Sequence, residues 1–176
     1  IQVLADASKL RHVALMVGNR DFLIAPQFLV GIGVHALADP RDAFVARAVL
    51  AAMADRSIDV QYYIWRGDEA GTMLFEALWE AAQRGVRVRL LLDDHNTGGL
   101  DPTLAALDAH PNIQVRLYNP VGQRAVRAIN SLTDFSRVNR RMHNTSFTVD
   151  NQMSVVGGRN IGDEYFGASE HSNFSD

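Results

Sequence analysis

The sequence contains no cysteine and only one lysine, Lys9. Without cysteine there are no disulfides, no thiolate zinc sites and no cysteine nucleophiles. Basic residues number 17, so nearly all of them are arginine, and the formal net charge is −3. This charge argues against a broad cationic surface of the kind that holds duplex DNA without sequence preference. A local basic patch stays open, but nucleic acid is not the partner that the composition favours.

Long hydrophobic runs are also absent. The most apolar early stretch, FLIAPQFLVGIGV (22–34), is too short to cross a bilayer and is broken by Pro26 and Gln27. Polar residues directly before it do not fit the arrangement of a signal peptide. We interpret the stretch as a buried strand or loop, with contact at a membrane surface as the alternative.

Alternating strand and helix patterns follow from residue 39 onward. The length of 176 residues, with 47% hydrophobic and 21% charged residues, is typical of one soluble domain. Strands are expected at 58–65, 86–94, 113–119, 144–150 and 152–158, and helices at 40–57, 72–85 and 101–109. This order predicts an α/β fold with a mixed, mostly parallel sheet flanked by helices.

Local signals support the first two helices. Asp39 and Pro40 are typical of an N-cap followed by the first helical residue. The pattern after them predicts an inward face with Phe44, Ala48 and Ala51 or Ala52. Gly85 is a typical stop for the second helix. In the sheet that results, ligands are expected at the carboxyl ends of the parallel strands.

The section 120–140 has weak periodicity and is expected to be a long loop with some helix. Loops of this length in compact domains are usually functional or mobile. The loop and the residue after it carry five arginines: Arg124, Arg127, Arg137, Arg140 and Arg141. These side chains could meet anionic headgroups. They could equally form ion pairs with Asp134 or Asp163.

The stretch RMHNTSFTVDNQMSVVGGRN, which ends at residue 160, is the most distinctive part of the sequence. On a strand, His143 and Thr145 share one face with the apolar residues that follow them. Gly157 and Gly158 allow close approach of the backbone, and Asn160 is a donor beside them. This set suits an anion that is attacked and held. Spacing alone, however, favours a structural alternative in which a lone histidine caps a strand beside a hairpin.

The same stretch resembles the signature of the phospholipase D superfamily, in which a histidine, a lysine, an aspartate, a glycine pair and an asparagine have fixed spacing. The matching positions are His143, Asp150, Gly157, Gly158 and Asn160. DVQYYIW, RGVRVRLLLDD, HNTGGLD and VRLYNP extend the resemblance to the first half of bacterial cardiolipin synthases. It covers roughly residues 35–176, and the first 34 residues match nothing that we can place.

The resemblance implies a mechanism and a substrate. His143, Asp150 and Asn160 would be catalytic, and a phosphohistidine would form on the imidazole of His143. The substrate phosphate would be bound by Thr145, Gly157, Gly158 and Asn160. Phosphatidylglycerol would be both donor and acceptor, at the cytoplasmic membrane, to which the protein would bind peripherally. No metal and no cofactor is implied.

Thr145 departs from the family pattern, which has lysine at this position. Threonine is shorter and neutral, so it cannot supply the charge that a lysine ammonium brings to phosphate oxygens. Three explanations are open. The motif is a naturally inactive site, or a site that a substitution has silenced, or a site in which Arg141 or Arg159 supplies the missing charge. As written, the chain is expected to be weak or inactive.

A superfamily active site combines two such motifs, and the sequence contains one. The second would come from another lobe of the same protein or from a second subunit. We expect residues 35–176 to form the first lobe of a two-lobed fold, incomplete at its C-terminus, with residues 1–34 unassigned. A phosphodiesterase or nuclease that acts as a homodimer is one alternative function, and a non-catalytic phosphate-binding lobe is another.

The sequence offers one further candidate for a ligand site. Asp93, Asp94 and His95 stand together at the end of a predicted strand and could suggest a metal. Adjacent acidic residues at a strand's end are more often loop or cap residues, and we interpret them in this way. His35, His110 and His171 lack any surrounding motif and are interpreted as surface or loop residues.

Overall fold

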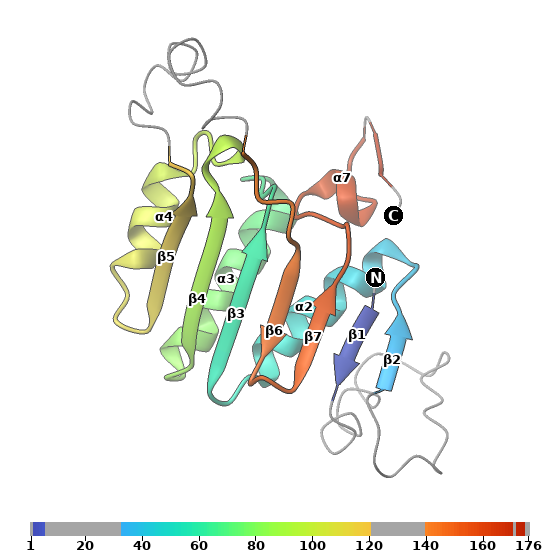
Figure 1. Ribbon diagram of the computed structural model, residues 1–176, viewed down its shortest axis with the longest axis horizontal. Coiled ribbons are helices and arrows are strands. Elements are labelled where there is room, and N and C mark those ends of the chain that lie inside the picture. The colour runs from blue at the N-terminus through green and yellow to red at the C-terminus, as the bar shows by residue number, and fades with distance from the viewer. Residues whose placement is uncertain (1, 6–32, 121–139, 171, 175–176) are drawn as a thin grey trace.

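The computed structural model describes residues 2–5, 33–120, 140–170 and 172–174. Within these ranges seven strands form one sheet in the order β2-β1-β7-β6-β3-β4-β5 (Figure 1). The strands are β1 (Gln2–Ala5), β2 (Gly33–Ala36), β3 (Ser57–Tyr62), β4 (Arg87–Asp93), β5 (Ile113–Tyr118), β6 (Ser146–Val149) and β7 (Met153–Val156). The helices are α2 (Pro40–Met53), α3 (Glu69–Gln83), the 3₁₀ turn η1 (Asp94–Asn96), α4 (Asp101–Asp108) and α7 (Asp163–Phe166).

Strand direction divides the sheet into two parts. β3, β4 and β5 are parallel neighbours, whereas β6 pairs antiparallel with β3, and β7, β1 and β2 continue antiparallel beyond it. The α/β class and the mixed sheet are confirmed. The expectation of a mostly parallel sheet is wrong, because antiparallel pairs outnumber parallel ones among the described strands. The cause is the β6–β7 hairpin, whose first strand pairs antiparallel with β3.

This topology brings distant segments to one edge of the sheet. The carboxyl ends of the three parallel strands lie together, at the upper edge in Figure 1. β6 runs the other way and begins at that edge, since Ser146 is the partner of Gln61 near the end of β3. β7 returns to it, with Val156 opposite Ser146. Residues just before β6 and just after β7 therefore meet the end of β3.

The core lies on one face of the sheet. Alternate residues of β3, such as Ile58, Val60 and Tyr62, are buried there, and α2 and α3 cover this face (Figure 1). The opposite face of the described sheet is polar, with an ion pair between Asp59 and Arg89 on neighbouring strands. Alternation of buried and exposed residues on β3 and β4 is typical of a sheet with one covered face.

The inward face of α2 differs in part from the expected one, which correctly included Ala51. Phe44 and Ala48 are only partly buried, and the buried residues are Ala43, Arg47, Leu50 and Ala51. Arg47 is 1% exposed, and its Nε donates a hydrogen bond of 2.8 Å to the hydroxyl of Tyr62. Its guanidinium also lies 5.6 Å from the ring centre of Phe166. An arginine with these partners can face the core, whereas the sequence pattern treats it as a surface residue.

α3 begins earlier than the sequence predicts. Asp68 is its N-cap and accepts a hydrogen bond of 3.0 Å from the backbone N–H of Gly71. A Cβ atom at Gly71 would lie 1.9 Å from the carbonyl oxygen of Arg66, so this glycine permits a close approach inside the first helical turn. At the other end, Gly85 has a φ of 93° and confirms the predicted stop.

The described residues of the segment 1–34, which the sequence left unassigned, contribute to the same sheet. β1 lies between β7 and β2, and β2 crosses the expected boundary at residue 34. Residues 6–32 and 121–139 are outside the described part, and with them most of the apolar stretch 22–34 and of the arginine-containing loop 120–140. No helix in the described ranges is long and apolar enough to span a membrane.

Candidate active site

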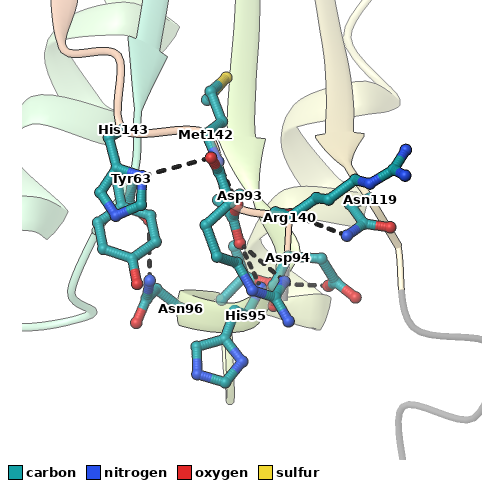
Figure 2. A network of polar contacts seen from close by, with 11 residues as sticks. Tyr63, Asp93, Asp94, His95, Asn96, Asn119, Arg140, Met142 and His143 are labelled. Atoms are coloured by element: carbon teal, nitrogen blue, oxygen red, sulfur yellow. Dashed lines mark hydrogen bonds and ion pairs between the residues drawn. The ribbon is translucent and has the colours of Figure 1, made fainter. Parts of the chain in front are cut away.

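His143 lies at the edge where β3 ends. It precedes β6 by three residues, and its ring packs against the ring of Tyr63, with 4.4 Å between ring centres and 32° between planes (Figure 2). Tyr63 directly follows β3, and its carbonyl oxygen accepts a hydrogen bond of 3.1 Å from Asn96 in η1. The imidazole is exposed. One side of the ring is thus supported by an aromatic residue while the imidazole stays accessible.

A backbone contact occupies one ring nitrogen of His143 and leaves the other available for reaction. Nδ1 of His143 lies 3.3 Å from the carbonyl oxygen of Arg141. A carbonyl oxygen can only accept, so the contact requires the proton to be on Nδ1. The lone pair then resides on Nε2, which is the form of imidazole that can attack an electrophile.

The segment before His143 is tied to the ends of two strands. Asp93, the last residue of β4, is 0% exposed and accepts a hydrogen bond of 2.9 Å from the backbone N–H of Met142. Asn119, just after β5, donates a hydrogen bond of 2.9 Å to the carbonyl oxygen of Arg140. Both contacts join residues far apart in the sequence, and Figure 2 shows them around the same short segment.

Asn160 reaches the same end of β3 from the other side. Its Oδ1 accepts a hydrogen bond of 3.0 Å from the backbone N–H of Ile64, the residue after Tyr63. Ile161 continues the contact, because its N–H donates to the carbonyl oxygen of Ile64 over 3.1 Å. His143 and Asn160 therefore contact two consecutive residues, Tyr63 and Ile64. Because Oδ1 of Asn160 already accepts this hydrogen bond, the Nδ2 group is the part of the side chain that can donate to a ligand.

Tyr165 is a further polar group beside Asn160. Burial raises the pKa of the Tyr165 hydroxyl, the negative charge of Glu164 adds to this rise, and a hydrogen bond with Asn160 partly offsets it. The hydroxyl is therefore protonated at neutral pH. It is a neutral neighbour of the Asn160 amide.

The glycine pair and the arginine between β7 and Asn160 have different environments. Gly157 and Gly158 are exposed, so their backbone is open to a ligand, in line with the predicted close approach. Arg159 is 2% exposed, and its guanidinium donates to the carbonyl oxygen of Tyr165. Its donors face the interior rather than the open edge.

Thr145 occupies the position where the superfamily has lysine. Its Oγ1 is buried and has no hydrogen-bond partner among the described residues. The two arginines that could replace the lysine are committed elsewhere: Arg141 pairs with Asp93 over 3.3 Å, with a side chain 9% exposed, and Arg159 faces Tyr165. The geometry therefore gives no support to rescue by either arginine.

Asp150, which the resemblance groups with His143, lies at the opposite edge of the sheet, where its carboxylate binds backbone groups. Its carboxylate accepts hydrogen bonds from the backbone N–H groups of Asp55, Arg56 and Ser57, over 3.0, 2.7 and 2.8 Å. Asp150 and Asn151 both have a φ of 54° and form the predicted turn between β6 and β7. A strand advances about 3.3 Å per residue, so seven residues separate Asp150 from His143 by roughly 20 Å.

We predict that Asp150→Asn lowers the free energy of unfolding without altering the site around His143. Hydrogen bonds to a charged acceptor contribute about 1.5–3 kcal/mol each, and the amide replaces part of this acceptor by a donor, so we expect a loss of about 2–4 kcal/mol. Urea unfolding measures it. Asp108→Asn is the control, since that carboxylate accepts the N–H of Val115 over 2.7 Å at an exposed position; it should cost less. Equal stability of the Asp150 variant and the parent would contradict this role.

Two residues that hold His143 were missed by sequence reasoning. Tyr63 was read only as part of a strand, and Asp93 only as a loop or cap residue. Asp93 does cap η1, by accepting the N–H of His95 over 2.9 Å, but it also holds the His143 segment.

Within the described part of the chain, no three His, Asp or Glu side chains gather in a group that could hold a metal ion.

Comparisons with known proteins agree with this arrangement. The family described as cardiolipin synthase, PLD-like domain, matches residues 49–174. Cardiolipin synthase C of Escherichia coli (strain K12) is 60% identical over 144 residues, which are 82% of this chain and 30% of that protein. The major cardiolipin synthase ClsA of Bacillus subtilis (strain 168) is 34% identical over 134 residues, which are 76% of this chain and 26% of that protein. The chain thus spans less than a third of the length of these relatives.

Solved structures show the same fold. NucT from Helicobacter pylori has a TM-score of 0.54 and 19% identity, over 72% of each chain. Phosphatidylserine synthase from Haemophilus influenzae Rd KW20 has a TM-score of 0.58 and 18% identity, over 78% of this chain and 31% of that one. The family model matches most of the chain, and the solved structures share its fold. This chain therefore belongs to the phospholipase D-like domains of the cardiolipin synthase family.

Proposed function

We propose that this chain supplies one of the two motifs of a phosphatidyltransferase of the cardiolipin synthase type. The observation that carries the proposal is the paired placement of His143 and Asn160. One is held beside Tyr63 and the other by Ile64, at the end of β3. The exposed imidazole has its proton directed to a backbone carbonyl, so that its second nitrogen is available.

The proposed reaction has two displacements at phosphorus. The Nε2 lone pair of His143 attacks the phosphorus of phosphatidylglycerol, the phosphorus–oxygen bond to glycerol breaks, and a second histidine protonates the leaving oxygen. A hydroxyl of another phosphatidylglycerol then attacks phosphorus, loses its proton to that second histidine, and the phosphorus–nitrogen bond breaks. Cardiolipin and glycerol are the products, and both histidines return to their first state.

The residues around His143 fit the charge changes in these steps. The imidazole becomes positive when it bonds to phosphorus, and the ring face of Tyr63 stabilises a cation packed against it. Asn160 would donate through Nδ2 to a phosphate oxygen, and the open backbone of Gly157 and Gly158 would lie beside the same group. Thr145 cannot supply the positive charge of a lysine, so we propose that transfer by this chain is weak or absent.

We further propose that the second histidine belongs to another lobe of the same protein. The matched part of this chain covers only 30% and 26% of these relatives, which supports this arrangement over a homodimer. The donor and acceptor are lipids, so the site would work at the surface of an anionic membrane, with peripheral attachment. Arg140 is exposed beside the site and would favour such a surface.

The test uses a protein that contains both this chain and the second motif and that carries the substitution Thr145→Lys. Its activity is compared on two substrates. Vesicles of labelled phosphatidylglycerol should give cardiolipin and glycerol, and single-stranded DNA should stay intact. Cleavage of DNA without lipid turnover would favour the nuclease alternative. Turnover of neither substrate would favour a non-catalytic phosphate-binding lobe.

A further inference from the structure

Asp93 is a buried carboxylate that the proposed reaction does not use directly. It is 0% exposed at the end of β4. Its oxygens accept from the N–H of His95 over 2.9 Å, from the N–H of Met142 over 2.9 Å and from Nη1 of Arg141 over 3.3 Å. A buried carboxylate is costly unless donors surround it, and here two of the three donors belong to the residues directly before His143.

The contacts continue from Asp93 to the imidazole. The side chain of Arg141 and the N–H of Met142 are both bound to the carboxylate, so the peptide between them is fixed at each end. The carbonyl oxygen of that peptide, which belongs to Arg141, is the partner of Nδ1 of His143 at 3.3 Å. Met142 is 7% exposed, so its side chain anchors the same peptide in the protein. Figure 2 labels Asp93, Met142 and His143, which lie along this sequence of contacts.

We propose that Asp93 is a positioning residue for the nucleophile: it fixes the Arg141–Met142 peptide and thereby the orientation and the tautomer of His143. Asp93 does not itself face the reacting atoms. The same contacts explain why Arg141 is not a substitute for the missing lysine, because its guanidinium balances the buried carboxylate. The catalytic consequence rests on the proposed function, whereas the effect on the imidazole does not.

The first test uses the 176-residue chain with ¹⁵N-labelled histidine. In the parent, two-dimensional NMR of the neutral His143 ring should show the tautomer with the proton on Nδ1. Asp93→Asn keeps the size of the side chain but places an amide donor among three donors, so the peptide should shift. We expect a mixture of ring tautomers and a change in the ring-current shifts that Tyr63 produces. An unchanged spectrum would overturn the proposal.

The matched control is Asp150→Asn. That carboxylate also accepts backbone N–H groups, but at the opposite edge of the sheet. It should lose stability and keep the His143 spectrum of the parent. If Asp93→Asn does not fold, Arg141→Gln replaces it, because it removes one donor and leaves the peptide intact. A shift of the tautomer mixture in that variant would support the proposal, and the parent spectrum would overturn it.

A kinetic test separates positioning from binding. In the complete protein with Thr145→Lys, Asp93→Asn should lower kcat by about tenfold or more, because a misoriented nucleophile loses its near-attack geometry, and should leave KM nearly unchanged. An unchanged kcat would overturn the catalytic part of the proposal. If the tautomer of His143 responds to Asp93 but no form of the protein turns over phosphatidylglycerol, the proposed function fails and the positioning role stands.

Discussion

Replacing Thr145 by lysine is expected to raise the turnover of phosphatidylglycerol by at least about 100-fold, in a protein that also contains the second motif. One preorganised donor at a developing oxyanion contributes about 10²–10³ in rate, and an ammonium contributes charge as well as hydrogen bonds. Thr145 supplies neither, since its hydroxyl is buried without a partner in the described structure. The measurement is the initial rate of cardiolipin formation on vesicles.

The control for this prediction is Thr145→Met, which has an unbranched side chain nearer the length of lysine but no charge. It should give no gain in rate if the charge is what matters. Equal rates for the parent and the Thr145→Lys protein would show that the family lysine acts elsewhere in this protein. A gain with methionine as large as that with lysine would attribute the effect to packing.

The second large effect is expected at His143. In the Thr145→Lys protein, His143→Asn should lower turnover by about 10⁴ or more, because removal of a catalytic nucleophile leaves only the contribution of binding and electrostatics. Asparagine keeps a donor near the position of Nδ1, so the contact with the Arg141 carbonyl can persist while Nε2 is lost. Cardiolipin formation at saturating lipid measures the change.

His110→Asn is the matched control for the loss of a histidine. His110 lies between α4 and β5, at the edge away from the site, where its Nδ1 accepts the N–H of Asn112 over 3.1 Å. This variant should retain the rate of its parent. Residual turnover above one hundredth of the parent rate in the His143→Asn protein would argue that another group attacks phosphorus.

The arrangement of the motif could be predicted from the sequence because it depends on local periodicity. Alternation along the strand correctly placed Phe147 and Val149 on the buried face, and the hairpin turn follows from Asp150 and Asn151, which tolerate a positive φ. A hairpin returns to the edge from which it started. His143 and Asn160 both lie next to the residues that follow β3 because they stand at the two ends of this hairpin.

The surroundings of Asp150 could not be predicted from the sequence. The motif groups this residue with His143, and the chain that runs from His143 through β6 carries it to the far side of the sheet. Its three backbone partners lie 93 to 95 residues earlier in the chain, so no local pattern indicates them.

Contacts that depend on sheet register could not be predicted from one sequence. The bonds from Arg141 and Met142 to Asp93 join residues 48 and 49 positions apart. They exist because β6 pairs with β3 rather than at another edge, and strand order is a tertiary outcome. The burial of Arg47 is similar, since it depends on Tyr62 and Phe166 reaching the same point.

The covalent intermediate gives the most direct measurement of the central claim. The Thr145→Lys protein with its second motif is mixed with labelled phosphatidylglycerol, quenched at alkaline pH to preserve phosphohistidine, digested and analysed by mass spectrometry. The phosphatidyl group should be found on the peptide that contains His143, and it should be absent from the His143→Asn protein. A label on any other residue, or rapid cardiolipin formation by the His143→Asn protein, would contradict nucleophilic attack by this imidazole.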